Sequence, residues 1–427
     1  MSTAQLDRPA PVLSRVTQLR HTSPGRLQLL LATLLATGLL TGLVAGLTGY
    51  AARSGTGDLG NRSQPLLVEA ETIYSALADA DTTAAQAFLA GGLEPPALTQ
   101  RYNADLARAT EALTSAARRT PATGTAADAV QALSSGIPQY AALVASARAN
   151  NRQGLTVGAS YLSAASTMNR DTLQKQADAL FRAAQADVNR GYGDARSIVW
   201  VIVLGLLLIV LVVTLIRAQR YLSRTTHRTF NLPLIAATAV TVVLALGVGG
   251  VLIAQEAHLH AAEADGSRPV AELAYARTLA LRERGDEALT LVARGGSGPA
   301  EEDFAKVAKP ALDKQLAVIA DDVSGAGTLA GKHAAYLAGR AKVRALDDGG
   351  DYAGAVTLSI GPASSGAFRD LTDSIGAVLE DHKTTFTTQI DDAGRGLGPL
   401  TVLGPLLALI ICGLAAAGIR ARLEEYR

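Results

Sequence analysis

Long apolar stretches alternate with polar, helix-like segments along this chain. Four stretches carry no charge and hold about 19–24 residues each, enough for a helix to cross a hydrocarbon core of about 30 Å. The stretches are Leu29–Tyr50, Ile198–Ile216, Leu232–Ala254 and Leu400–Ile419. We place the corresponding membrane spans at residues 27–50, 198–216, 231–254 and 399–419. The pattern predicts an all-α membrane protein with four transmembrane helices and two large polar segments, residues 51–197 and 255–398.

The two polar segments are predicted to be repeats of one another. Each has a Ser-x-Pro motif near its start, a Gly-Gly pair at the same distance from it, and a later tyrosine. The matching pairs are Ser63 and Ser267, Pro65 and Pro269, Gly91 and Gly295, and Tyr140 and Tyr336. Spacing and topology carry this match more than residue identity.

Each segment is predicted to form four antiparallel helices, separated by glycine- and proline-rich stretches that stop helices. In the first, turns are expected at Gly91–Pro96, Arg119–Gly124 and Asn150–Gly154, with a kink or break before Pro138. In the second, breaks are expected at Gly295–Pro299, Ser324–Gly331, Asp347–Gly350 and Gly361-Pro362. The expected architecture is two repeated extracytoplasmic four-helix bundles that resemble sensor domains, with two turns of each bundle at the tip farthest from the membrane.

Arginines predict the orientation. Basic residues dominate the short segments 1–26, 217–230 and 420–427, which are therefore expected to be cytoplasmic. Both termini then lie inside and both long segments outside a cell membrane. The first span is longer than the hydrophobic region of a typical signal peptide, and we expect it to remain as an anchor.

This topology limits the function. No cytoplasmic piece approaches the roughly 50 residues of the smallest independent domains, so any signal must pass to another polypeptide. A formal net charge of +1 gives no indication of nucleic acid binding. The single cysteine, Cys412, excludes an internal disulfide. The best metal-like pair, His258-x-His260, is expected on different faces of a helix. We therefore expect no catalytic site, no metal and no cofactor.

Three groups of residues are candidates for contacts. The tips carry hydrogen-bonding and acidic side chains, which also suit plain helix stops followed by polar loops: Asn150, Asn151, Arg152, Gln153, Asp347 and Asp348. The link between spans two and three carries basic residues that either only set topology or also dock a cytoplasmic partner: Arg217, Arg220, Arg224 and Arg228. A small-residue stripe in the first span allows close helix packing, within the chain or between copies in a homo-oligomer: Gly38, Gly42 and Gly46.

The architecture, together with the stretch Ala147–Leu162 and the stretch Ala84–Gly92, resembles the GlnX family of bacterial membrane proteins. The resemblance implies a link between an extracellular lipoprotein that binds glutamate or aspartate and a cytoplasmic Ser/Thr protein kinase. It brings no functional residues with it. Our leading hypothesis is thus a non-enzymatic transmembrane relay. The alternatives are a permease-like or mechanotransmitting subunit partnered with an ATPase, and a direct small-molecule chemosensor.

Overall fold

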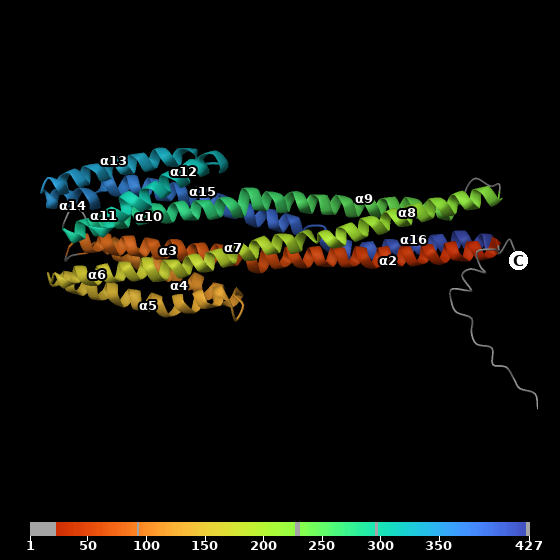
Figure 1. The fold of residues 1–427 in the computed structure, drawn as a ribbon, viewed down its shortest axis with the longest axis horizontal. Coiled ribbons are helices and arrows are strands. Elements are labelled where there is room, and N and C mark those ends of the chain that lie inside the picture. Colours follow the sequence, from red (N-terminus) through yellow and green to blue (C-terminus); the bar gives the residue numbers. More distant parts are fainter. Residues whose placement is uncertain (1–22, 92–93, 227–230, 295–297, 424–427) are drawn as a thin grey trace, which may run out of the picture. The chain divides into compact units, whose positions relative to one another are not determined.

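The structure, a computed structural model, describes residues 23–91, 94–226, 231–294 and 298–423 (Figure 1). Within these ranges it contains helices and no strand. Four helical stretches are long and apolar enough to cross a membrane, and they include α2 (Ser23–Asp58), α8 (Ile198–Thr226), α9 (Leu232–Ala261) and α16 (Leu397–Leu423). The chain is therefore an all-α membrane protein, as its hydropathy pattern predicts.

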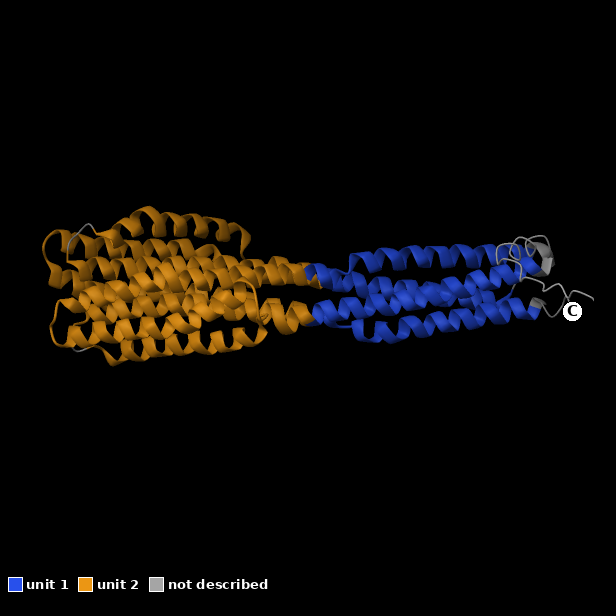
Figure 2. Cartoon of the chain, turned by 60° about the horizontal axis from the view of Figure 1, so that its bottom comes forward, with its two compact units in different colours: residues 1–57, 192–257, 392–427 blue, residues 58–191, 258–391 orange. Residues whose placement is uncertain are grey.

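Two compact units divide the chain (Figure 2). Unit 1 consists of residues 1–57, 192–257 and 392–427, and unit 2 of residues 58–191 and 258–391. Unit 1 contains the apolar helices, whereas unit 2 contains nearly all of both polar segments. The two polar segments thus belong to one compact unit.

Unit 1 has an apolar interior and an apolar exterior. Its core is built from residues of all four apolar helices, among them Leu34, Leu211, Leu244 and Ile411. Many leucines, isoleucines and valines of the same helices are exposed, with Leu43 61% and Leu246 71% exposed. An exposed apolar surface of this kind suits a lipid environment, where burial away from water is supplied by the bilayer.

The glycine stripe of the first span lies against α16 within the chain. A Cβ added to Gly38 would come within 2.6 Å of the Cys412 sulfur, and one added to Gly42 within 2.6 Å of the Ala408 Cβ. At Gly46 the nearest atom would be a Pro405 side-chain carbon at 3.0 Å. The missing side chains let the two helix backbones approach closely, as small-residue stripes do in membranes.

Replacing Gly42 by leucine is therefore expected to destabilise the packing of unit 1 by about 1–3 kcal/mol, the usual cost of overpacking a close contact. The thermal midpoint of the full chain in detergent, followed by protease resistance, measures the effect. Gly205→Leu on α8 is the matched control, because nothing lies within 4 Å of a Cβ at that glycine. Equal midpoints for the two variants would contradict the prediction.

The first polar segment folds into helices that agree closely with the expected ones. They are α3 (Gln64–Leu89), α4 (Pro96–Arg119), α5 (Thr125–Arg152), α6 (Val157–Met168) and α7 (Gln174–Arg196). Of the kink or break expected before Pro138, the break is wrong, because α5 continues through the proline. A proline removes one backbone donor, and the buried face of α5, which includes Leu133 and Tyr140, is packed on both sides of it.

The second polar segment is divided more finely. Its helices are α10 (Arg268–Ala293), α11 (Pro299–Asp303), α12 (Lys309–Asp322), α13 (Leu329–Asp348), α14 (Tyr352–Ile360) and α15 (Pro362–Gly394). The expected breaks near Ser324, Gly350 and Gly361 are all present. The break expected at Gly295–Pro299 falls mostly on residues 295–297, which lie outside the described residues.

A π-helical turn precedes the Ser-x-Pro motif in both polar segments. Turn η1 (Leu59–Ser63) leads from α2 into α3, and turn η3 (Ala262–Ser267) leads from α9 into α10. Because proline has no N–H to donate, the helical hydrogen-bond ladder must adjust just before Pro65 and Pro269. The helical path nevertheless runs without a break from each of these spans into unit 2.

At the end of each polar segment, by contrast, a residue with positive φ separates the last helix of the segment from the following span. Ser197 (φ 46°) separates α7 from α8, and Gly396 (φ 83°) lies between α15 and α16. Positive φ values interrupt a right-handed helix, and serine adopts them only at a conformational cost. Each polar segment is thus joined to one span by continuous helix and to the next through a left-handed residue.

The core of unit 2 is organised around α3 and α10, which lie side by side (Figure 1). Between Ala76 and Ala85 every residue of α3 is buried, and α10 is similarly enclosed around Ala280–Ala288. Each of these helices packs with its own segment on one side and with the other segment on the opposite side. Acidic and basic residues of both helices are therefore buried together with the apolar ones.

Candidate functional site: the tip groove and the buried polar network

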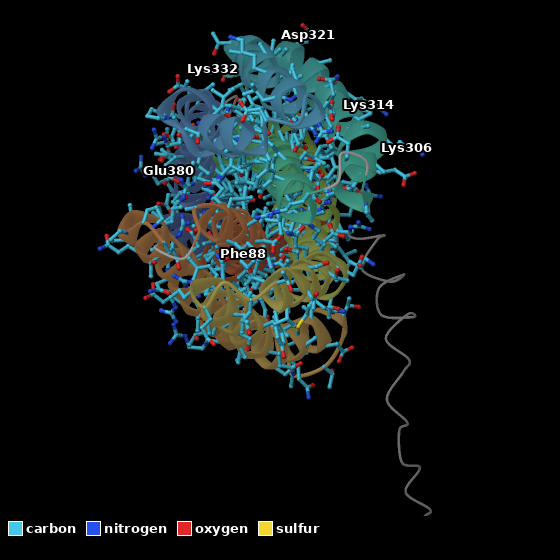
Figure 3. All side chains as sticks on the ribbon, turned by 90° about the vertical axis from the view of Figure 1, so that its left-hand side faces the viewer. Phe88, Lys306, Lys314, Asp321, Lys332 and Glu380 are labelled. Carbon is cyan, nitrogen blue, oxygen red and sulfur yellow. The ribbon has the colours of Figure 1, made fainter. Side chains whose placement is uncertain are left out.

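Unit 2 contains a groove of about 750 Å³ to which both polar segments contribute. We call it the tip groove. Its lining includes Phe88 and Leu89 of α3, Asn151 of α5, Gly154 of the turn before α6, and Tyr352 of α14. Figure 3, drawn from the left-hand side of Figure 1, shows Phe88 near the middle of this end. The tip turns of the two segments thus meet around one site.

Backbone conformations of low intrinsic stability shape the groove. Gly91 (φ 87°) and Gly154 (φ 72°) both adopt left-handed conformations that glycine accepts easily. Arg294 adopts φ 50° without that freedom, and its guanidinium lies 4.8 Å from the centre of the Tyr352 ring. Strained non-glycine residues of this kind concentrate at binding sites and switches.

Exposed apolar side chains adjoin the groove at the start of α6. Leu155 is 47% exposed, Val157 46% and Tyr161 39%. Leu155 lines the groove itself. A concave site next to clustered exposed apolar residues is typical of surfaces that bind another protein.

The predicted tip residues have mainly local contacts. Asn151 lines the groove, and its amide donates to the Phe88 carbonyl at 2.9 Å. The Asn150 amide donates to the Ser146 carbonyl, whereas Arg152 and Gln153 are exposed. Asp347 and Asp348 form ion pairs with Arg344 of their own helix at 2.8 Å and 2.7 Å, and neither lines the groove.

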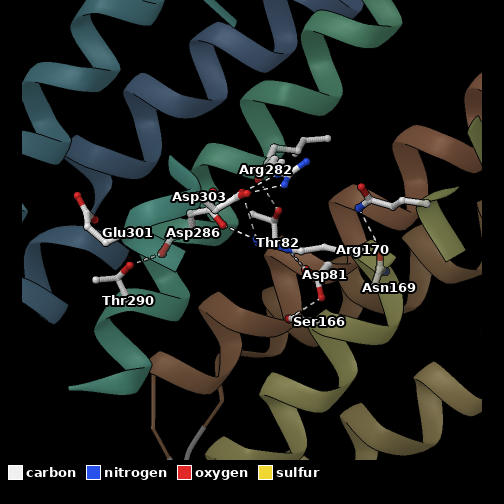
Figure 4. A network of polar contacts seen from close by, with 12 residues as sticks. Asp81, Thr82, Ser166, Asn169, Arg170, Arg282, Asp286, Thr290, Glu301 and Asp303 are labelled. Atoms are coloured by element: carbon white, nitrogen blue, oxygen red, sulfur yellow. Dashed lines mark hydrogen bonds and ion pairs between the residues drawn. The ribbon is translucent and has the colours of Figure 1, made fainter. Parts of the chain in front are cut away.

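A second site is a buried polar network where the two polar segments meet (Figure 4). Arg170, on the π-helical turn η2 (Asn169–Leu173), pairs with Asp286 of α10 and lies 3.5 Å from Asp81 of α3. Gly285 leaves room for it, since a Cβ there would lie 2.8 Å from an Arg170 nitrogen. Asp303 of α11 pairs with Arg282 at 2.6 Å and lies 3.9 Å from Arg170. One guanidinium therefore holds carboxylates from both segments.

Hydroxyl and amide groups complete this network. The Ser166 hydroxyl donates to Asp81 at 2.8 Å, and the Thr82 hydroxyl donates to the Leu281 carbonyl at 2.9 Å. The Asn169 amide donates to the Leu77 carbonyl at 3.0 Å. Most of the buried polar atoms in the network thus have partners, which burial requires.

Burial changes the acidity of the network. It raises the pKa of Asp286 to about 7, against the opposing effect of Arg170. It also raises the pKa of Asp81, again opposed by Arg170. The pKa of Asp303 is lowered: burial acts against this, but the hydrogen bonds from Arg282 prevail. When Asp286 is protonated, the two remaining negative charges of the network equal the two positive charges of its arginines.

This acidity predicts a pH effect on stability. The folded chain takes up a proton on Asp286 near pH 7, whereas the unfolded chain does so only near pH 4. Lowering the pH from 8 to 6 should therefore stabilise unit 2 by about 1 kcal/mol through this group. Asp286→Asn should remove that increment, measured as the difference between the urea unfolding curves of the two proteins at each pH. Identical pH slopes for both proteins would show that Asp286 does not titrate in this range.

A third group of buried polar residues lies within the second polar segment. Arg284 is 1% exposed and pairs with Glu287 at 2.8 Å, and it also donates to the Ser359 carbonyl at 2.6 Å. The Tyr336 hydroxyl donates to Glu287 at 3.0 Å. Nearby, Glu283 contacts the His333 ring at 2.9 Å. These contacts tie α10, α13 and α14 together in the core.

Sequence reasoning missed both buried networks. A signal was present, because Asp79 and Asp81 of α3, and likewise the adjacent Asp286 and Glu287 of α10, point to different helix faces. Acids on several faces are compatible with a helix that is surrounded by protein and has partners on all sides. Local sequence motifs alone do not identify those partners.

The predicted cytoplasmic residues are only partly described. Arg217 and Arg220 are exposed on α8. The side chain of Arg224 and the whole of Arg228 lie outside the described residues. His258, expected not to share a metal with His260, contacts the Gln389 amide oxygen at 2.7 Å. In the part of the chain that the structure describes, no cluster of three or more potential metal ligands is found.

Comparison with protein-family models finds a match in the first polar segment. Residues 55–193 match the family model of the actinobacterial sensor domain. No curated protein and no solved structure matches the chain. Together with the four apolar helices, the match supports a sensing or signalling role in a membrane protein of the actinobacterial type.

Proposed function

We propose that this chain is a non-enzymatic transmembrane relay whose tip groove binds an extracytoplasmic partner protein. The observation that carries the proposal is the groove of about 750 Å³, which draws residues from both polar segments and adjoins exposed Leu155, Val157 and Tyr161. A partner that contacts both segments would favour one packing of α3 against α10 over another. The sensor-domain match supports this role for the first segment.

The resemblance to the GlnX family supplies the finer form of the proposal. The extracytoplasmic partner is a solute-binding lipoprotein of the glutamate or aspartate type, and the cytoplasmic partner is a Ser/Thr kinase. The exposed Arg217 and Arg220 of α8 contribute to kinase docking. The continuous helical paths from the two entering spans into α3 and α10 are the elements that transmit the change. Such transmission requires two packings of similar energy.

The test is recovery of partners from membranes after crosslinking. The full chain should co-purify with a lipoprotein and a kinase, and Leu155→Glu with Tyr161→Glu should lose the lipoprotein while retaining the kinase. Val318→Glu is the matched control, since Val318 is 41% exposed on α12 and does not line the groove. Arg217→Gln with Arg220→Gln should lose the kinase alone. Recovery of neither partner with the unaltered chain would rule out the relay.

A further inference from the structure

A smaller cleft is lined by residues of both polar segments. Its volume is about 220 Å³, and six of its lining residues are Asp79, Thr82, Thr83, Arg101, Phe368 and Arg369. The volume is well above the roughly 30 Å³ of one water and below the 300–1,000 Å³ of pockets for drug-sized ligands. A molecule of the size of an amino acid or a short dicarboxylate fits such a space.

Arg369 occupies the position that corresponds to Arg170. Arg170 lies 27 residues before the left-handed Ser197, and Arg369 lies 27 residues before the left-handed Gly396. The positions in the other segment that correspond to the two acids around Arg170 are found by counting the same number of residues from Ser63 and from Ser267. Asp81 corresponds to Gly285, and Asp286 corresponds to Thr82.

Both carboxylates are therefore missing on the Arg369 side. Arg170 is paired with Asp286 and lies 3.5 Å from Asp81. Arg369 is exposed and forms no ion pair within the described part of the chain. Thr82 lines the cleft, but its hydroxyl already donates to the Leu281 carbonyl. Its oxygen can still accept a hydrogen bond but carries no negative charge, so it cannot neutralise Arg369 as a carboxylate would.

The remaining charges leave the cleft attractive to an anion. Asp79 is buried and already paired with Arg277 at 3.0 Å. Arg101 lies 3.5 Å from Asp79, at the limit of a hydrogen bond, and its side chain is 41% exposed. Two guanidinium groups thus line the cleft opposite one carboxylate that has another partner. Paired guanidinium groups are the preferred protein ligands for carboxylates.

We infer that the cleft between α3, α4 and α15 binds a small organic carboxylate. The carboxylate group of this ligand pairs with Arg369 in the way that Asp286 pairs with Arg170. Arg101 binds a second anionic or polar group of the same ligand. Because the ligand contacts both polar segments, its binding favours the packing of α3 and α4 against α15 that closes the cleft. The inference concerns binding by the chain alone and does not depend on the partners of the relay.

The test is calorimetric titration of the full chain in detergent with succinate, and with succinamide as a neutral molecule of the same shape. Succinate should bind saturably and succinamide should not. Arg369→Gln should weaken succinate binding by about ten- to a hundred-fold, as expected for loss of a charge-assisted contact. Arg118→Gln is the matched control, because Arg118 is exposed on α4 and does not line the cleft.

A second variant tests the correspondence with Arg170 directly. Thr82→Asp restores the missing acid, which should pair with Arg369 and abolish succinate binding; circular dichroism shows whether this variant is folded. The inference is overturned if succinate gives no saturable binding up to about 10 mM, the range of weak but specific sites. It is equally overturned if Arg369→Gln binds succinate as well as Arg118→Gln does. Neither result affects the recovery of partners from membranes.

Discussion

Replacing Arg170 by methionine is expected to destabilise unit 2 by about 3–5 kcal/mol, the cost of removing one partner from a buried ion pair. The loss leaves Asp286, which is fully buried, and Asp81, which is 5% exposed in its side chain, without their common cation. Urea unfolding of the full chain in detergent, followed by pulse proteolysis, measures the change. Since the free energy of unfolding of natural domains is only about 5–15 kcal/mol, a change of this size should be easily measured.

A matched control separates charge from side-chain volume. Arg182→Met on α7 removes a side chain that is 75% exposed and pairs only with Asp178 of the same helix, so it should cost less than about 1 kcal/mol. Combining Arg170→Met with Asp286→Asn, at pH 8, removes one of the acids left without a cation. This double variant should show a favourable coupling of about 1–3 kcal/mol relative to the sum of the single changes. A cost for Arg170→Met no larger than that of Arg182→Met would mean that the network does not hold the segments together.

Replacing Arg284 by methionine is expected to have a similar effect, about 3–5 kcal/mol, for a related reason. Arg284 and Glu287 are both almost completely buried, and Arg284 also binds the Ser359 carbonyl and the Ser364 hydroxyl. Those two serines lie on either side of the break at Gly361, so the guanidinium fixes how α14 meets α15. The same unfolding measurement applies.

Two further variants test whether an unpaired buried charge causes this loss of stability. Arg268→Met lies on the same helix but removes a side chain that is 65% exposed, and it should have little effect. Arg284→Met with Glu287→Gln should be more stable than Arg284→Met alone, because the buried carboxylate is then neutral. If the double variant is the less stable of the two, the uncompensated charge is not the source of the cost.

The pattern of apolar residues is sufficient for much of the fold. Charge-free stretches such as Leu232–Ala254 can satisfy their backbone only as helices in a bilayer, so their number and approximate limits follow from composition. Turns such as Gly91 and Gly350 adopt left-handed conformations that favour glycine, so they can be recognised in isolation. The continuity of α5 through Pro138 could not be predicted from the sequence, since it depends on packing on both sides of the proline.

The sequence by itself thus determined the helices, the four spans and the tip turns, because these depend on residues close together in the chain. Only the tertiary structure decided that Arg170 meets Asp286, that Arg284 meets Ser359, and that Arg369 is left facing a cleft without an acid. Such pairs lie many residues apart, and their partners are chosen by how α3 and α10 pack. Local propensity and periodicity carry no information about that choice.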